Sequence, residues 1–202
     1  MRNIQYIVEY KKAFSLDDCH RIIEKRVSAS DKQPYEDIVY WKHKSKNTEW
    51  SFIVDIFLES LKPIIDQYLG QFAGDLDFKD LDLLGVALMR HPAGTYDNHH
   101  FDTPVGISNN NHVYRPFVCL VYLNGEDIEG GQLVFPAQGK IIEPEGGKCV
   151  LFPCSFMFPH KVATVSSGER LFVRFNFKFK SDNLIDRELD EWDVTKNGVS
   201  FN

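Results

Sequence analysis

The sequence predicts a mainly β domain, a sandwich or barrel, with helices confined to its first 80 residues. In that first part, apolar side chains recur every three or four positions, whereas beyond Leu81 short apolar segments are separated by Gly, Pro, Asn and Asp. A helix places every third or fourth residue on one face and a strand every second one, so this change of period indicates a change of secondary structure. Several short strands at such spacing are typical of a sandwich or barrel.

Two helices are expected in the first part of the chain. Ser15 can cap a helix over Asp17–Val27, because its side chain can accept a hydrogen bond from the first turn and acidic residues favour that end. An apolar stripe over Trp50–Leu69 predicts a second helical region that covers one face of a sheet, with a kink at Pro63. Short strands are expected over Gln5–Val8 and Asp37–Trp41.

The later part of the chain predicts a series of strands. They are expected over Gly85–His91, Phe117–Leu123, Gln132–Phe135, Lys140–Ile142, Lys148–Phe152, Lys161–Val165 and Arg170–Lys180. The last is the clearest, because its residues alternate strictly between two faces. One face carries Leu171, Val173, Phe175, Phe177 and Phe179, and the other carries Arg170, Phe172, Arg174, Asn176, Lys178 and Lys180.

Composition limits the number of domains and the kind of partner. With 202 residues, 43% of them hydrophobic and 16 of them Phe, the chain can form one domain with a sizeable core. We expect helical support over residues 1–80, a β core over 81–180 and a polar tail over 181–202. The net charge of −6 makes a nucleic-acid partner unexpected, and no apolar run is long enough to span a membrane.

The cysteines indicate the redox environment in which we expect the protein to work. Cys19, Cys119, Cys149 and Cys154 form no CxxC pair, and the first residues lack the apolar segment of a signal peptide. Free thiols in a reducing, cytoplasmic environment are therefore expected.

His100 and Asp102 form the candidate centre of the chain. In an extended strand, side chains two apart project from the same face, so an imidazole and a carboxylate can meet at one point. If His160 approaches from another strand, the set becomes two histidines and one carboxylate on one side of an ion. That arrangement suits non-haem Fe(II), because it leaves coordination positions open for other ligands.

Seven motifs in order resemble the Fe(II)- and 2-oxoglutarate-dependent dioxygenases, specifically the prolyl 4-hydroxylase-like group. They cover most of the chain: Phe14–Cys19 at the first helix, His100-x-Asp102, Arg115 with Tyr122-Leu123-Asn124, Gly130–Pro136, Pro144-x-x-Gly147 running into Val150–Phe152, His160, and Val165 with Gly168 and Arg170. The resemblance implies a double-stranded β-helix, or jelly roll, with the N-terminal helices packed on its major sheet.

The resemblance also implies roles for individual residues. His100, Asp102 and His160 would hold Fe(II). Arg170 would bind the distal carboxylate of 2-oxoglutarate, since a guanidinium pairs with a carboxylate through two parallel hydrogen bonds. Tyr122 would donate a hydroxyl to that carboxylate or serve as a core aromatic residue. A final candidate for the co-substrate site is His91, at a position where relatives often have a tyrosine.

The proximal motif departs from the family pattern. His99 doubles the histidine, and Tyr96 lies four residues before His100, where the family often has a tyrosine at three. A ligand pair based on His99 would require Phe101, which has no donor atom. His100 therefore remains the expected ligand.

A second departure concerns the substrate. Asn176 follows Arg170 by six residues, where many prolyl hydroxylases have a tryptophan, and Arg174 shares its face. Together with Arg115, these residues are candidates for contacts with the substrate. The segment Thr103–Tyr114, rich in Asn, is long enough to act as a substrate lid.

The activity implied by the resemblance is hydroxylation of a C–H bond with Fe(II), 2-oxoglutarate and O2, giving succinate and CO2, with ascorbate as an additional reductant. The expected substrate is a prolyl residue in a peptide or protein. A free amino acid or another small molecule is an alternative that the polar Arg174 and Asn176 would favour. Further alternatives are a catalytically silent metal-binding jelly-roll module, a zinc protein and, against the acidic charge, a nucleic-acid demethylase.

Overall fold

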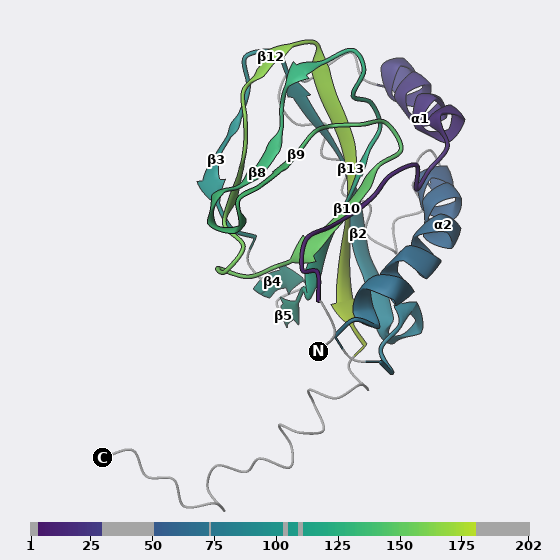
Figure 1. The fold of residues 1–202 in the computed structure, drawn as a ribbon. Coiled ribbons are helices and arrows are strands. Elements are labelled where there is room, and N and C mark those ends of the chain that lie inside the picture. Colours follow the sequence, from purple (N-terminus) through teal and green to yellow (C-terminus); the bar gives the residue numbers. More distant parts are fainter. Residues whose placement is uncertain (1–3, 30–50, 73, 103–104, 109–110, 181–202) are drawn as a thin grey trace, which may run out of the picture.

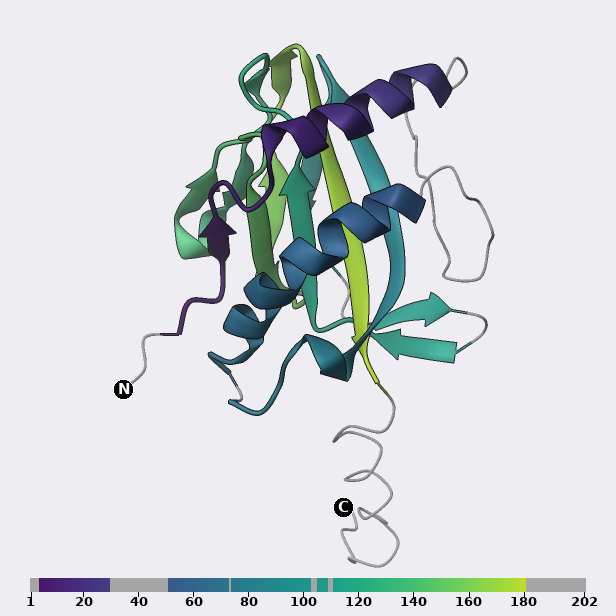
Figure 2. The same ribbon diagram turned by 90° about the vertical axis from the view of Figure 1, so that its right-hand side faces the viewer.

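Two antiparallel sheets face each other, and two helices lie across the outer face of the larger one (Figures 1 and 2). The structure is a computed structural model that describes residues 4–29, 51–72, 74–102, 105–108 and 111–180. The larger sheet has the strand order β1-β10-β6-β13-β2 and the smaller sheet the order β3-β11-β8-β9. Two short ribbons, β7 with β12 and β4 with β5, complete the β-structure of the described residues.

The elements have the following bounds. In chain order they are β1 (Val8–Tyr10), α1 (Leu16–Ala29), α2 (Ser51–Leu69), the 3-10 helix η1 (Phe78–Asp80), β2 (Leu81–Pro92), β3 (Asp97–His100), β4 (Val105–Ser108), β5 (Asn111–Tyr114), β6 (Phe117–Tyr122), β7 (Glu129–Gly130), β8 (Leu133–Phe135), the 3-10 helix η2 (Pro136–Gln138), β9 (Lys140–Ile142), β10 (Cys149–Pro153), β11 (His160–Val162), β12 (Val165–Ser167) and β13 (Glu169–Phe179).

Successive strands alternate between the two sheets. β2, β6, β10 and β13 belong to the larger sheet, and β3, then β8 with β9, then β11 intervene in the smaller one. The chain thus winds around the space between the sheets as a jelly roll, which confirms the expected fold class. This winding matters for function because it brings strands that are distant in sequence to the same end of the molecule.

The larger sheet buries both of its faces. Its helix-side face packs against α1 and α2 in a cluster that includes Phe57, Leu61 and Phe175. Its inner face meets the smaller sheet in a second cluster that includes Tyr122 and Phe172. The strict alternation expected for the last strand is confirmed, because its odd-numbered residues from Leu171 to Phe177 belong to the first cluster, whereas Phe172 belongs to the second.

The two predicted helices are present. At the start of α1, the Ser15 Oγ accepts a hydrogen bond from the Asp18 amide at 3.1 Å, as expected for a cap. α2 contains Pro63 and continues through it to Leu69. The Pro63 side chain lies on the exposed side of the helix.

Several element boundaries differ from the prediction. β1 lies at Val8–Tyr10 rather than Gln5–Val8, since pairing with β10 rather than local alternation decides which residues are extended. β2 begins at Leu81, four residues before the expected start. The segment expected as one strand over Lys161–Val165 is divided between β11 and β12, which pair in different sheets.

The segment Thr103–Tyr114, expected as a loop, forms a hairpin of β4 and β5 over its described residues. The strand expected over Asp37–Trp41 and the tail over 181–202 lie outside the described residues. Cys19, Cys119, Cys149 and Cys154 are buried free thiols. Among the described residues, no helix is both long and apolar enough to cross a membrane.

Candidate active site

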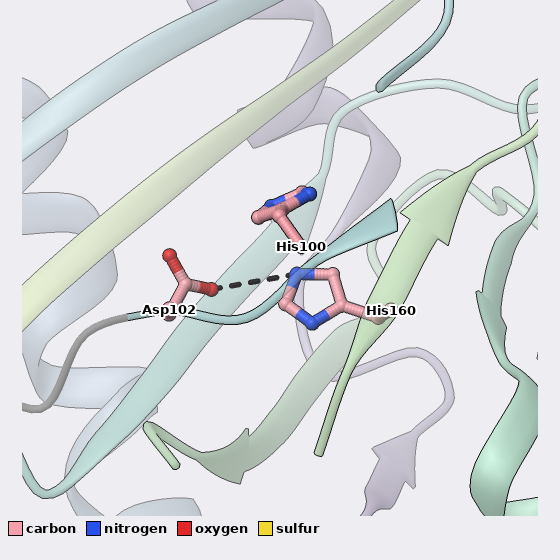
Figure 3. Close-up of side chains that lie close together, drawn as sticks. All are labelled: His100, Asp102 and His160. Atoms are coloured by element: carbon pink, nitrogen blue, oxygen red, sulfur yellow. Dashed lines mark ion pairs between the residues drawn. The ribbon is translucent and has the colours of Figure 1, made fainter. Parts of the chain in front are cut away.

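Three potential metal ligands converge at the rim of the smaller sheet (Figure 3). The ligand atoms of His100, Asp102 and His160 all lie within 4.8 Å of one another. The His160 Nε2 atom is 3.5 Å from Asp102 Oδ2, and the two imidazole rings are 4.4 Å apart between centroids. Within the described ranges this is the only such group of three or more His, Cys, Asp or Glu side chains.

Strand pairing brings the distant histidine to the other two residues. β11 is antiparallel to β3, and His160 lies directly opposite His100. β3 ends at His100, so Asp102 lies just beyond the strand rather than within it, which corrects the expected placement. Its carboxylate still turns toward His160, as Figure 3 shows.

Both imidazoles are held in the form that a metal requires. The Nδ1 atom of His100 lies 2.7 Å from the Asn98 carbonyl oxygen, and that of His160 lies 3.1 Å from the Phe158 carbonyl oxygen. Only a protonated Nδ1 can donate to these carbonyls, so each Nε2 keeps a free lone pair. Burial lowers the pKa of His160, which also favours its neutral form.

Arg170 lies deeper on the inner face of β13. Its side chain is 0% exposed, its Nη1 lies 3.1 Å from His91 Nδ1, and its Nη2 donates to the Tyr122 hydroxyl at 3.2 Å. The guanidinium carbon lies 4.2 Å from the Phe172 ring centroid and 5.0 Å from that of Tyr122. The structure therefore places the three predicted co-substrate residues together.

The Arg170 site fits an anionic ligand. Its buried Nε has no hydrogen-bond partner, and no carboxylate of the described residues forms an ion pair with it. A buried charge without a counter-ion costs several kcal/mol, which a bound carboxylate would offset. The arrangement of a neutral two-histidine, one-carboxylate set with this cation fits Fe(II) together with a dicarboxylate.

His91 lies between Arg170 and Asp97. Because Arg170 donates to its Nδ1, the proton of the neutral ring is on Nε2, which lies 3.6 Å from Asp97 Oδ2. Burial and then the Arg170 charge lower the pKa of His91. The neutral imidazole thus orients the guanidinium without adding a second charge.

The predicted substrate residues lie further along the inner face of the larger sheet. The Arg174 Nη1 atom is 3.9 Å from Asp102 Oδ1, and the Arg115 Nη1 atom donates to Asn176 Oδ1 at 3.4 Å. Burial raises the pKa of the neighbouring Cys154 thiol to about 12, although both guanidinium groups act in the opposite direction. Arg115, Arg174 and Asn176 thus form one polar region beside the metal-ligand set.

Sequence reasoning missed Asp97 and Phe172 as parts of this region. Phe172 could have been found, because it shares a strand face with Arg170 and lies two residues away. Asp97 could not, since its approach to His91 depends on how β3 of the smaller sheet lies relative to β2 of the larger one. A depression of about 550 Å³ lies elsewhere, between the start of α1 and the loop Leu123–Asp127, and contains none of these residues.

Comparison with solved structures shows the same fold. A viral collagen prolyl hydroxylase from Paramecium bursaria Chlorella virus-1, in complex with 2-oxoglutarate, has a TM-score of 0.64 and 17% identity, covering 87% of this chain and 97% of its own. A 2OG-Fe(II) oxygenase family oxidoreductase from Burkholderia pseudomallei has a TM-score of 0.61 and 16% identity, covering 86% and 84%. A Pseudomonas putida prolyl-4-hydroxylase has a TM-score of 0.56 and 21% identity, covering 87% and 94%.

Comparison of the sequence with family models gives a match over part of the chain. No curated protein matches the chain significantly. Residues 85–178, however, match the family model of the 2OG-Fe(II) oxygenase superfamily. This segment contains the metal-ligand set and Arg170. Over this segment the chain is therefore similar to the 2OG-Fe(II) oxygenase superfamily, and its fold is similar to that of prolyl hydroxylases.

Proposed function

We propose that this protein is a dioxygenase that hydroxylates a C–H bond with Fe(II), 2-oxoglutarate and O2, and that its substrate is a prolyl residue in a peptide or protein. The observation that carries the proposal is the juxtaposition of the His100, Asp102 and His160 set with the buried Arg170 on the facing sheet. The likeness to prolyl hydroxylase structures supports the choice of substrate.

In this proposal, His100, Asp102 and His160 would hold the metal through two imidazole nitrogens and one carboxylate. Bound Fe(II) would supply the activation of O2, coupled to decarboxylation of 2-oxoglutarate to succinate and CO2. The rings of Phe135 and Phe152 lie 5.3 and 5.0 Å from that of His160 and exclude water behind it. This packing fixes the position of the ligand, and a preorganised site needs little rearrangement on binding.

Arg170 and Tyr122 would bind the distal carboxylate of 2-oxoglutarate. Arg170 retains unused donors, and the Tyr122 hydroxyl accepts from Arg170 and so can donate its own proton to an anion. His91 would keep the guanidinium in place from the other side. Charge-assisted hydrogen bonds of this kind are about twice as strong as neutral ones.

A free amino acid or another small molecule is the second candidate substrate. The polar side chains of Arg174 and Asn176 favour it, because Arg174 lies beside Asp102 and Asn176 shares the strand face of Arg174. In either case, we propose that the segment Thr103–Tyr114 acts as a lid on the substrate. Protease sensitivity of this segment that does not change with substrate, Fe(II) and an inert co-substrate analogue would contradict the lid.

The decisive experiment measures succinate formation from 2-oxoglutarate with Fe(II), using proline-containing peptides and free amino acids. His100→Ala and Asp102→Ala should each abolish turnover and weaken metal binding at least about a hundredfold, because each removes a ligand. His99→Ala is the matched control, since this exposed histidine precedes His100 directly and belongs to no cluster of ligands.

Retained turnover in the Ala variants of His100 or Asp102 would overturn the assignment. Metal and 2-oxoglutarate binding without any succinate, even in the absence of substrate, would instead indicate the catalytically silent module. Turnover with free amino acids but not with peptides would favour the second candidate.

A further inference from the structure

A second guanidinium lies on the inner face of β13, four residues beyond Arg170. The Arg174 Nη1 atom is 3.9 Å from Asp102 Oδ1, which is longer than a hydrogen bond, and its Nε is buried without a partner. Unlike Arg170, the side chain is 25% exposed, so a molecule entering from solvent can reach it. Arg174 is thus a cation at the open edge of the site.

No neighbouring strand neutralises this charge. On the two sides of Arg174 in the sheet lie Ala87 of β2 and Leu120 of β6, both buried and uncharged. Among the described residues, Asp102 is the only carboxylate in an ion pair with Arg174. If Asp102 is a metal ligand, its charge is shared with the metal, and Arg174 keeps an unused positive charge.

We propose that Arg174 is a specificity-determining residue that binds a carboxylate of the substrate. The inference rests on the proposed function and names its substrate class: a molecule with a carboxylate close to the oxidised carbon. The carboxylate can belong to a free amino acid or to an acidic side chain or C-terminus of a peptide. Arg115 and Asn176, bonded to each other, form the adjoining polar wall.

Geometry limits how far the carboxylate can lie from the reacting carbon. Adding a charge-assisted hydrogen bond of about 2.8 Å to the separation between Arg174 and Asp102 places a bound carboxylate within about 7 Å of the metal-ligand set. This span corresponds to a few covalent bonds. A substrate of amino-acid size, or a residue next to an acidic one, fits that distance.

The alternative is that Arg174 only orients Asp102. An orienting arginine would affect every substrate equally, whereas a carboxylate-binding arginine would discriminate an acid from its amide. Matched pairs of compounds therefore separate the two roles.

The experiment compares proline with prolinamide, and peptides that contain Pro beside Glu with peptides that contain Pro beside Gln. Succinate formation gives kcat/KM, and calorimetry under nitrogen with Fe(II) and 2-oxoglutarate gives Kd. The proteins are the wild type, Arg174→Met, Arg174→Lys and the control Lys178→Met. Lys178 lies on the same strand but is paired with Asp82 at 3.4 Å, away from the ligand set.

For at least one pair, we expect the wild type to prefer the acid by about 10- to 100-fold in kcat/KM and in Kd, as for a charge-assisted hydrogen bond. In Arg174→Met this ratio should fall toward one, and Arg174→Lys should retain part of it, since the charge remains without the planar fork. Lys178→Met should keep the full ratio. The pair that discriminates identifies the source of the carboxylate.

Equal rates for acid and amide in every pair with the wild type would overturn the inference. An equal loss for both members in Arg174→Met, accompanied by weaker metal binding, would also overturn it and indicate the orienting role. Failure of the proposed function is distinguishable, because then the wild type would form no succinate even in the uncoupled reaction without substrate.

Discussion

Two buried cations in this protein have opposite surroundings. Lys148 is 2% exposed, and its Nζ lies 3.3 Å from Glu9 Oε2 and 3.2 Å from Glu145 Oε2. Arg170 is fully buried beside a neutral histidine and a tyrosine. The Lys148 charge is compensated within the protein, whereas Arg170 has no carboxylate partner among the described residues. In the proposed function, Lys148 is a structural cation and Arg170 binds an anion.

The contrast predicts different effects of removing each charge. We expect Arg170→Met to leave the Tm of the ligand-free protein unchanged or higher, because it removes a buried charge without a carboxylate partner. Lys148→Met should lower Tm, since it removes the buried cation that Glu9 and Glu145 share, although Glu9 keeps its ion pair with Lys140 at 3.3 Å. Thermal unfolding followed by circular dichroism measures both.

The same variants separate an effect on the stability of the ligand-free protein from an effect on ligand binding. Saturating 2-oxoglutarate with Fe(II) under nitrogen should raise the Tm of the wild type and of Lys148→Met, because a ligand of the folded state stabilises it. Arg170→Met should show only the rise that Fe(II) alone produces. A ligand-induced rise in Arg170→Met equal to that of the wild type would contradict the role of Arg170.

We predict that the free energy of unfolding depends on pH through His91. Burial and Arg170 lower its pKa in the folded protein, so the unfolded chain binds more protons at this residue. Its contribution to the free energy of unfolding is complete above the unfolded-state pKa of about 6.5 and is lost as the pH falls below that value. We therefore expect His91→Gln to show a shallower loss of stability than the wild type between pH 7.5 and 5.

Denaturant unfolding of the metal-free proteins at several pH values measures this difference. His20→Gln, at an exposed position on α1, is the control and should follow the wild-type curve. Parallel curves for His91→Gln and the wild type would show that His91 titrates alike in the folded and unfolded states.

At the scale of elements, the turn between β12 and β13 sets the position of Arg170. Gly168 has φ +76°, and a Cβ there would lie 2.2 Å from the Asp127 carbonyl oxygen. Gly139, which ends η2, has φ +60° with no atom within 4 Å of such a Cβ. The two glycines share the left-handed conformation, but only Gly168 lies against another segment of backbone.

Replacing each glycine with alanine therefore separates the cost of the left-handed backbone conformation from the cost of a steric clash with neighbouring backbone. Gly139→Ala should cost about 1 kcal/mol of the free energy of unfolding, the usual penalty for a Cβ in this conformation. Gly168→Ala should cost at least about 3 kcal/mol, because backbone must also move. Urea unfolding gives both values, and similar losses in the two variants would show that the turn can relax.

At the scale of the molecule, we propose one domain in which residues 1–80 support the jelly roll. Phe57 of α2 is 0% exposed and lies between Phe14, at 4.4 Å between ring centroids, and Phe175 of β13, at 5.8 Å. The helix side of β13 thus packs on α2, while its opposite face carries Arg170 and Arg174. The same strand, β13, therefore contacts α2 on one face and carries the candidate site residues on the other.

Phe57→Ala tests this unity. It should destabilise the protein by about 3–5 kcal/mol, as for a fully buried aromatic side chain. Unfolding followed by circular dichroism and by loss of metal binding should shift together to lower denaturant concentrations. Phe156→Ala, at a side chain 73% exposed, is the control and should change stability by less than about 0.5 kcal/mol. Separate transitions for the two probes would indicate independent units.

The sequence by itself determined the features that depend on local spacing. The alternation of β13 follows from a period of two, and the start of α1 follows from the cap at Ser15. The order of motifs from His100 to Arg170 was sufficient to indicate the resemblance to the superfamily, because each motif lies within a short segment of the chain.

Only the tertiary structure decided which distant groups meet. The register of β11 on β3 places His160 opposite His100, and the winding between sheets brings Asp97 to His91 and Asp102 to Arg174. Strand alternation alone could not distinguish Arg170 from Arg174, since both share a strand face, and only the motif containing Gly168 singled out Arg170. Their neighbours on other strands bury Arg170 fully and leave the Arg174 side chain 25% exposed, because burial arises from contacts between segments far apart in the chain.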